Sequence, residues 1–523
     1  MEGTIFSLIP PIVAILMVIL TRRVLLSLGI GIVVGALILN DFSVMASIER
    51  VWEGFRAIFA GQNEETGAWE INTWNVYILL FLLLLGIMTA FISITGGSRA
   101  FGEWAEQRVK TRVGAQLVAA FLGIIIFIDD YFNALAVGQI SRPLTDRQRI
   151  SRAKLAYIID STSAPICVVS PISSWGAYII AIIGTILTTH AITDMSAFSA
   201  FVQIIPMNLY VIATILLVFA VSIFNINIGP MKAHETRAVR EGQVVDPEKG
   251  GIPGELKGDL PSSKKGKIID LVIPILILVI GTVGSMIYTG AKAVEGTVTL
   301  LTIFENTDVA TSLFYGGIMG VIVSFIMYVR HNMGGRLFFT GIWEGIKSML
   351  PAVYILVFAW IIVDIIGALE TGKYLAGIVE RSNMNIAYLP AVIFIIAGLM
   401  AFSTGTSWGT FGIMLPIAGE IAASTDISIL LPTLGAVLAG SVFGDHCSPI
   451  SDTTILSSTG AGSHHIDHVL TQLPYALIAA AISFIGYIIV GITNNWFIGI
   501  GIVVALLILI IIVIRKFDGE SVQ

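Results

Sequence analysis

The sequence has little charge and few cysteines. Only 12% of its 523 residues are charged, whereas an average soluble domain carries roughly 25%. Because so few charges cannot cover a water-exposed globule, a soluble enzyme, a nucleic-acid binder and a disordered scaffold are excluded. The two cysteines, Cys167 and Cys447, lie in apolar stretches, and neither their number nor their spacing indicates a disulfide framework or a zinc site.

Long apolar runs dominate what is present. The hydrophobic fraction is 56% and the mean hydropathy is +0.90. Apolar runs of about 18 to 22 residues recur from end to end, which is typical of an all-α polytopic membrane protein. The first run, at 5–20, has no basic segment before it and no small-residue cleavage site after it, so it is interpreted as a retained first span.

Basic residues orient the spans, since loops rich in Lys and Arg stay in the cytoplasm. Arg22 and Arg23 follow the first span, which predicts an N-terminus outside. Arg515 and Lys516 follow the last span, which predicts a cytoplasmic C-terminus. We expect about eleven crossings between these ends.

Four apolar stretches do not fit simple crossings. The stretch at 113–141 has basic flanks on both sides, is too short for two crossings of ~20 residues each, and carries two aspartates at its centre. It is predicted to be a re-entrant hairpin open to the cytoplasm, and 387–421 a second hairpin open to the outside. The long stretches at 155–189 and 429–462 are predicted to be single crossings, each broken into two half-helices at prolines and hydroxyl residues.

The two halves of the chain resemble each other. Trp52-Glu-Gly-Phe-Arg56 matches Trp343-Glu-Gly-Ile-Lys347, for example. An odd number of crossings separates the copies, so the second copy is predicted to be inverted, which is typical of secondary transporters. The predicted organisation is a first transmembrane helix at 1–23, a first repeat at 24–224, a flexible cytoplasmic linker at 225–267, a connecting helix and outer loop at 268–310, a second repeat at 311–490, and a last transmembrane helix with its tail at 491–523.

Six aspartates lie at membrane depth, where an ionisable group costs ~2.5–3.5 kcal/mol and is usually functional. They are Asp129, Asp130, Asp160, Asp364, Asp445 and Asp452. No Lys or Arg lies in the same segments as five of them, which argues against the alternative of salt-bridged carboxylates. For Asp364, near the end of its span, both interpretations stay open.

Oxygen donors crowd beside these aspartates. The predicted ligands, besides the five central aspartates, are Asn133, Ser161, Thr162, Ser163, Thr404, Thr406, Ser407, Ser448, Ser451 and Thr453. Carboxylate, hydroxyl and freed carbonyl oxygens suit hard cations such as Na⁺. Two neighbouring buried carboxylates also favour a bound proton, and a site that accepts either H⁺ or Na⁺ couples their movements. Alternatively, the hydroxyls bond only backbone groups that Pro and Gly leave free.

Histidines and tryptophans are assigned simpler roles. His446 lacks the three or four ligands that a zinc-type site requires. His464, His465 and His468 are interpreted as a solvated loop cluster rather than as pH sensors, and Trp175 and Trp408 as packing residues.

The run Gly444-Asp-His-Cys-Ser-Pro-Ile-Ser-Asp-Thr-Thr454 resembles the motif of the NhaC-type Na⁺/H⁺ antiporter family. The runs Phe127-Ile-Asp-Asp-Tyr-Phe-Asn133 and Asp160-Ser-Thr-Ser-Ala-Pro165 are also similar to that family. The resemblance implies an exchanger of the bacterial or archaeal inner membrane, within the broad ion-transporter superfamily. It further implies paired hairpins, a homodimer in the lipid bilayer, and a transport domain that moves as an elevator.

Two transport functions stay open. The first is Na⁺/H⁺ exchange, and the second is Na⁺- or H⁺-coupled transport of a small carboxylate, such as malate or lactate, or of an amino acid. The hairpin tips lack Arg and Lys, which favours the first function because an organic anion would be helped by a cationic partner. An intramembrane enzyme is not expected, since no H-E-x-x-H or G-x-S-x-G motif lies among the spans. We expect no cofactor.

Overall fold

The computed structural model describes residues 2–21, 23–62, 68–127, 129–171, 173–249, 261–294, 297–371, 374, 377 and 385–520. Within these ranges, eight helical segments are long and apolar enough to cross a membrane, and a bent pair makes a possible ninth. The protein is therefore a predominantly helical, multi-pass membrane protein. Other apolar stretches form shorter helices that break partway.

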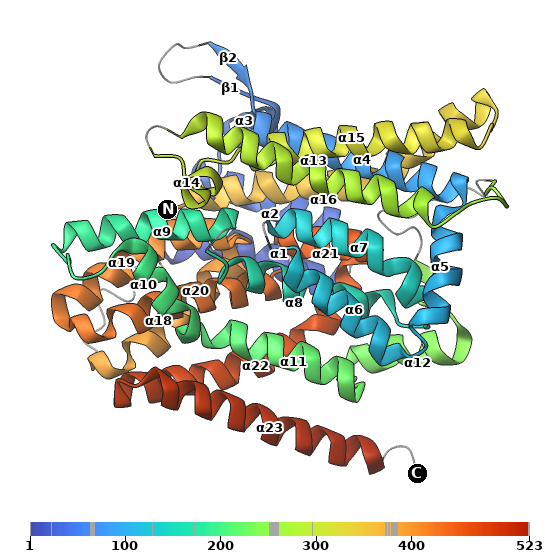
Figure 1. Ribbon diagram of the computed structural model, residues 1–523. Coiled ribbons are helices and arrows are strands. Elements are labelled where there is room, and N and C mark those ends of the chain that lie inside the picture. The colour runs from blue at the N-terminus through green and yellow to red at the C-terminus, as the bar shows by residue number, and fades with distance from the viewer. Residues whose placement is uncertain are drawn as a thin grey trace.

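Six apolar helices pack together into a part of the molecule that is called here the frame (Figure 1). Its members are α1 (Ile9–Thr21), α2 (Val24–Leu39), α4 (Thr73–Thr95), α13 (Ile269–Ala293), α15 (Val309–Arg330) and α16 (Gly335–Ala368). α4 packs against both α15 and α16, and α2 packs on α16. α4 is apolar on all sides, as expected of a helix surrounded by others. α16 begins at Gly335, so the Trp343 motif is helical.

The segment between α2 and α4 contains regular structure. α3 (Val44–Phe59) leads into a hairpin of β1 (Ala60–Gln62) and β2 (Trp69–Ile71). The strands are antiparallel, with Gly61 opposite Glu70. In Figure 1 the hairpin projects from the edge of the frame.

The stretch at 113–141 forms two helices that pack together, α6 (Arg112–Ile125) and α7 (Asp130–Arg147). α7 starts afresh because Asp129 is extended and caps it, accepting a hydrogen bond from Phe132 N at 3.0 Å. Asn133 braces the break by donating to the carbonyl oxygens of Gly123 and Ile126, both at 2.6 Å.

The stretch at 155–189 is also two helices, α8 (Arg152–Cys167) and α9 (Ser174–Thr189). Pro165 lies in the last turn of α8, and Ser173 caps α9 by accepting from Gly176 N at 2.9 Å. The interruption expected from proline and hydroxyl residues is therefore present between the end of α8 at Cys167 and the start of α9 at Ser174.

The second half of the chain repeats this order of elements. A second helix pair, α18 (Leu389–Thr404) and α19 (Ser407–Thr425), precedes a second interrupted segment, α20 (Leu430–Cys447) and α21 (Asp452–Ala461). Gly405 turns the chain between α18 and α19 at φ +70°, a conformation that glycine adopts without strain. Ser451 caps α21 by accepting from Thr454 N at 3.3 Å.

The two halves pack crosswise. α7 contacts α21, and α19 contacts α9, so the second helix of each pair lies on the second helix of the other half's interrupted segment. Gly138 and Gly460 make the first contact possible: a Cβ atom on Gly138 would lie 2.4 Å from the carbonyl carbon of Gly460. This packing brings the breaks of both halves to the same region.

The helical segment that contains α10 (Ala197–Ile204) and α11 (Leu209–Phe224) is bent by 50° between them. The bend falls where Asn208 caps α11 by accepting from Val211 N at 3.2 Å. The remaining elements are α5 (Gly97–Arg108), α14 (Leu300–Glu305), α22 (His465–Thr493), α23 (Trp496–Glu520) and short 3₁₀ helices at Ile5–Leu8, Ile205–Met207, Pro247–Lys249, Ile386–Tyr388 and Ile427–Ile429.

The predicted flexible linker contains a docked helix, α12 (Pro230–Glu241), so flexibility was the wrong expectation for that part. Buried Glu235 forms an ion pair with Arg112, lies 3.6 Å from Lys154 Nζ, and accepts from Ser151 N at 2.7 Å. Burial also lowers the pKa of His234 on the same helix. Composition did not reveal these contacts because the helix is polar. Residues 250–260 lie outside the described ranges.

Candidate ion-binding site

Asp445, at the end of α20, is surrounded by hydroxyl groups. Its Oδ1 accepts from Ser451 Oγ at 2.5 Å and from Thr453 Oγ1 at 3.3 Å. Its Oδ2 accepts from Ser407 Oγ at 2.7 Å. The side chain of Asp445 is buried, so its hydrogen-bond donors among the described side chains are neutral hydroxyls around a carboxylate removed from water.

Asp130 lies at the first turn of α7. Its Oδ1 accepts from the indole nitrogen of Trp175 at 2.8 Å, whereas its buried Oδ2 has no hydrogen-bond partner among the described residues. Ser163 donates to the backbone carbonyl of Asp130 at 2.7 Å. The sequence predicts Trp175 to be a packing residue. Its ring does pack on Trp408, but its N–H also donates a hydrogen bond to the Asp130 carboxylate.

Asp452 opens α21 and belongs to the same region. Its Oδ2 accepts a hydrogen bond from the hydroxyl of Tyr131, and its Oδ1 accepts from Thr453 N at 2.9 Å. The carboxylates of Asp129, Asp445 and Asp452 all lie close enough to repel that of Asp130. We call Asp129, Asp130, Asp445 and Asp452 the acidic cluster; it draws two residues from each half of the chain.

Other predicted ligands bond the backbone instead. Thr162 donates to the carbonyl of Ile158 at 2.7 Å, Thr404 to that of Met400 at 2.8 Å, and Ser448 to that of Phe402 at 2.8 Å. Asn133 braces the α6–α7 break, and Thr406 lies just before α19 without capping it by its side chain. For Thr162, Thr404, Ser448 and Asn133, the alternative of satisfying the backbone describes the contacts better.

Asp160 has a separate set of partners. His468 Nε2 lies 3.1 Å from its Oδ2, Gln472 Nε2 donates to the same oxygen at 2.6 Å, and Ser457 Oγ donates to Oδ1 at 3.2 Å. The expectation of a solvated histidine cluster was therefore wrong for two members. His468 is buried against Asp160, and buried His465 lies 2.8 Å from the carbonyl oxygen of Pro449.

His446 also lies within this polar core. Its Nε2 is 3.1 Å from Ser161 Oγ, and its Nδ1 is 2.8 Å from the hydroxyl of Tyr210. Local sequence pattern did not predict Tyr131, Ser457 and Gln472 as members of this core, nor the roles of Trp175 and His468. The spacing of His465, His468 and Gln472, which places them on one face of α22, was the available signal.

Asp364 lies away from the acidic cluster. It forms an ion pair with Arg50 at 2.7 Å, and its side chain is 46% exposed. Of the two interpretations left open for it, the salt-bridged carboxylate is correct.

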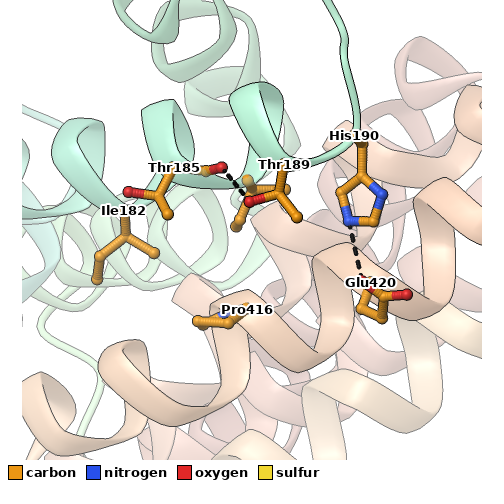
Figure 2. Close-up of a pocket in the computed structure, with 7 residues that line it drawn as sticks. Ile182, Thr185, Thr189, His190, Pro416 and Glu420 are labelled. Carbon is orange, nitrogen blue, oxygen red and sulfur yellow. Dashed lines mark hydrogen bonds and ion pairs between the residues drawn. The ribbon is translucent and has the colours of Figure 1, made fainter.

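Figure 2 shows a pocket between α9 and α19, with a volume of about 250 Å³. His190 Nε2 lies 3.1 Å from Glu420 Oε2 across it. Thr185, Thr189 and Pro416 also line it, and it contains none of the predicted ligands. His190 follows the last residue of α9, far along that helix from the break.

Helix breaks from two halves that meet around buried carboxylates define a multi-pass membrane transporter of the ion-coupled class. The Na⁺/H⁺ antiporter family profile matches residues 166–492, more than half of the chain, and the chain belongs to that family. The resemblance seen in the Asp445 motif is thereby confirmed.

Relatives extend the similarity. The chain is 47% identical over 519 residues to an uncharacterized protein of Haemophilus influenzae, covering 98% of this chain and 96% of that protein. It is 32% identical over 200 residues to the malate-2H(+)/Na(+)-lactate antiporter of Bacillus subtilis, covering 36% and 39%. It is 32% identical over 159 residues to an uncharacterized Na(+)/H(+) antiporter of Haemophilus influenzae, covering 29% and 32%.

Proposed function

We propose that the protein exchanges Na⁺ for H⁺ across the cell membrane of a bacterium or archaeon, and that both ions bind at the acidic cluster. The observation that carries this proposal is the environment of Asp445, whose described side-chain partners are three hydroxyls. Asp130 and Asp452 lie nearby, and neutral hydroxyls do not balance the combined negative charge of the carboxylates. The acidic cluster therefore requires either bound protons or a cation.

The donor set suits Na⁺. Among the described residues, no group of three or more His, Cys, Asp and Glu side chains is arranged to hold a metal ion. Na⁺ would instead take hydroxyl oxygens, from Ser407, Ser451 or Thr453, beside one or two carboxylates. A proton bound to a cluster carboxylate removes the charge that attracts Na⁺, so the two ions compete.

Transport in proteoliposomes tests this function. An imposed pH gradient should drive ²²Na⁺ uptake by the wild-type protein, and Na⁺ added to detergent-solubilised protein should release protons to a pH dye. Absence of both effects would contradict Na⁺/H⁺ exchange.

A second candidate is the coupled transport of a small carboxylate or amino acid. The Bacillus subtilis relative is named for malate and lactate, and α7, α9, α19 and α21 all begin near the acidic cluster, where helix N-termini favour anions. Malate, lactate and amino acids, added singly to the ²²Na⁺ assay, distinguish the two. Na⁺ movement that requires one of them favours the second candidate.

We also propose the topology expected from the sequence: eleven crossings and two re-entrant hairpins, α6–α7 and α18–α19, in two inverted repeats. The N-terminus would lie outside and the C-terminus inside. Cysteines placed at Arg142 and at Glu420 should then react with impermeant reagents from opposite sides. Labelling of both from one side would contradict the inversion.

The acidic cluster would move relative to the frame in a homodimer. Thr89 on α4 donates to Gln139 Oε1 on α7 at 3.0 Å, so this contact joins the frame to the first hairpin. In a background with Cys167 and Cys447 replaced by Ser, a disulfide between Thr89→Cys and Gln139→Cys should stop transport until it is reduced. A disulfide between Thr289→Cys and Ser312→Cys, whose hydroxyls lie 3.3 Å apart within the frame, is the control. Normal transport by the oxidised α4–α7 variant would exclude this movement.

A further inference from the structure

We propose that Asp160 and His468 form a second proton-binding site, distinct from the acidic cluster. The site rests on the proposed function, because its proton would take part in the same exchange cycle. The observation behind it is the free nitrogen of His468: Nε2 faces Asp160, while buried Nδ1 has no partner among the described residues.

The hydrogen bonds fix where a proton would go. Asp160 accepts at both oxygens, so Nε2 of His468 carries the hydrogen that it donates to Oδ2. In the neutral imidazole the lone pair is then on Nδ1. A proton that binds Nδ1 makes an imidazolium, and the adjacent Asp160 carboxylate balances its charge. Release of that proton restores the neutral ring without altering the Nε2 hydrogen bond.

His446 provides an internal comparison. Both of its ring nitrogens have a partner, Ser161 at one and Tyr210 at the other, so a neutral imidazole uses its donor and its acceptor fully. His446 and His468 therefore differ in one respect. Among the described contacts, His468 has a ring nitrogen without a partner, Nδ1, and His446 has none. His468 is the exchangeable group, and His446 is a structural bridge.

A direct path connects the pair to the acidic cluster. Gln472 Nε2 donates to Asp160 Oδ2 and to the carbonyl oxygen of His446, both at 2.6 Å. His446 follows Asp445 in the chain. A change of charge at His468 therefore acts on the Asp160 carboxylate. The Gln472 amide links this carboxylate to the end of α20, and the end of α20 positions Asp445.

Other titratable groups face the pair from the helices around it. They are Tyr210 on α11, Asp445, His446 and Cys447 on α20, and His465 on α22 itself, where Asp467 also precedes His468 in the chain. The charge of Asp467 is already balanced by Lys249 Nζ at 2.5 Å, and His465 bonds a backbone carbonyl. Asp160 is therefore the carboxylate that directly contacts His468.

Separating Na⁺ exchange from proton movement tests the assignment. His468→Gln should retain ²²Na⁺/Na⁺ exchange, which needs no net proton transfer, but release fewer protons for each Na⁺ bound. His446→Gln is the matched control and should keep the wild-type proton yield. A wild-type proton yield and pH profile in His468→Gln would overturn the proposal.

A spectroscopic measurement keeps the test independent of the substrate. In wild-type protein labelled with ¹⁵N-histidine, the signal that His468→Gln removes should change from the neutral to the imidazolium form when the pH is lowered. In Asp160→Asn this signal should stay neutral under the same conditions. A His468 signal that does not titrate in the wild-type protein would overturn the proton site, even if Na⁺/H⁺ exchange is established. Conversely, a titrating signal in a protein that moves no Na⁺ would reject the proposed exchange and leave the proton site standing.

Discussion

The tips of the two helix pairs occupy equivalent places in the two halves but carry different chemistry. The first tip presents Asp129 and Asp130, and the second presents Thr406 and Ser407. Asp130 accepts a hydrogen bond from Trp175, whereas Ser407 donates one to Asp445. The repeated backbone brings the starts of α7, α9, α19 and α21 together. Because the two copies carry different residues at their tips, the first tip supplies negative charge and the second supplies hydrogen-bond donors.

The interrupted segments differ in a parallel way. Asp160 on α8 contacts the imidazole of His468, whose protonation can balance its charge, whereas Asp445 on α20 accepts from neutral hydroxyls alone among its described side-chain partners. A carboxylate beside a histidine can remain charged within the protein, whereas one among neutral donors needs an ion from outside. The comparison predicts that the two aspartates respond differently to the same substitution.

The largest effect is expected from Asp445→Asn, which keeps the shape and removes the charge. Loss of a charged ligand costs about 1.5–3 kcal/mol, which corresponds to roughly 10- to 100-fold weaker Na⁺ binding. Na⁺-induced proton release should fall to background, and Asp130→Asn should act similarly. Asp364→Asn, which removes an exposed ion pair, is the control and should release protons normally. Normal release from both Asp445→Asn and Asp130→Asn would place the chemistry elsewhere.

The next largest effect concerns the contact that joins the halves. Gly138→Ala would place a Cβ atom 2.4 Å from the Gly460 backbone, which cannot yield as a flexible side chain does. Overpacking of this kind costs about 1–3 kcal/mol, so the midpoint of thermal unfolding in detergent should fall. Gly284→Ala, in the middle of α13 with nothing within 4 Å of the added atom, should leave it unchanged or raise it. An unchanged midpoint for Gly138→Ala would show that the α7–α21 contact adapts.

The sequence was sufficient for the parts of this site that depend on local pattern. Charged residues within apolar stretches identified Asp130 and Asp445, and prolines and hydroxyls located the interruption between α8 and α9. Ser407 and Ser451 were found because they lie beside a turn near a candidate aspartate.

Contacts between distant segments were beyond such reasoning. Asp160 and His468 are 308 residues apart, and His468 lies near the start of a span, where hydropathy suggests solvent. The donor role of Trp175 was hidden because an indole in an apolar helix is usually a packing residue. The docking of α12 depends on Glu235 meeting Arg112, which no local property of a polar segment reveals.

A smaller effect is expected from Trp175→Phe. This change removes the N–H that donates to Asp130 and leaves a ring of similar character. Without the donor the Asp130 anion is less stabilised, so protons compete better and the Na⁺ concentration for half-maximal proton release should rise. The loss of one hydrogen bond to a charged group predicts a rise of roughly tenfold. Trp408→Phe, which alters the neighbouring ring contact, should change this concentration little, and equal values for the two variants would assign Trp175 to packing alone.

The smallest effect is expected at the pocket between α9 and α19. Glu420 lies 3.1 Å from His190, but its side chain is 64% exposed, so water and salt screen the pair. Such pairs contribute about 0.2–1 kcal/mol, and Glu420→Gln should change ²²Na⁺ uptake by less than about fivefold. The pocket lies along the second hairpin, whose tip supplies hydrogen-bond donors rather than charge. Removing the charge of Glu420 therefore tests whether transport requires a charged residue in that hairpin. Loss of uptake comparable to that of Asp445→Asn would place Glu420 on the ion path. Both hairpins would then contribute a charged residue that transport requires.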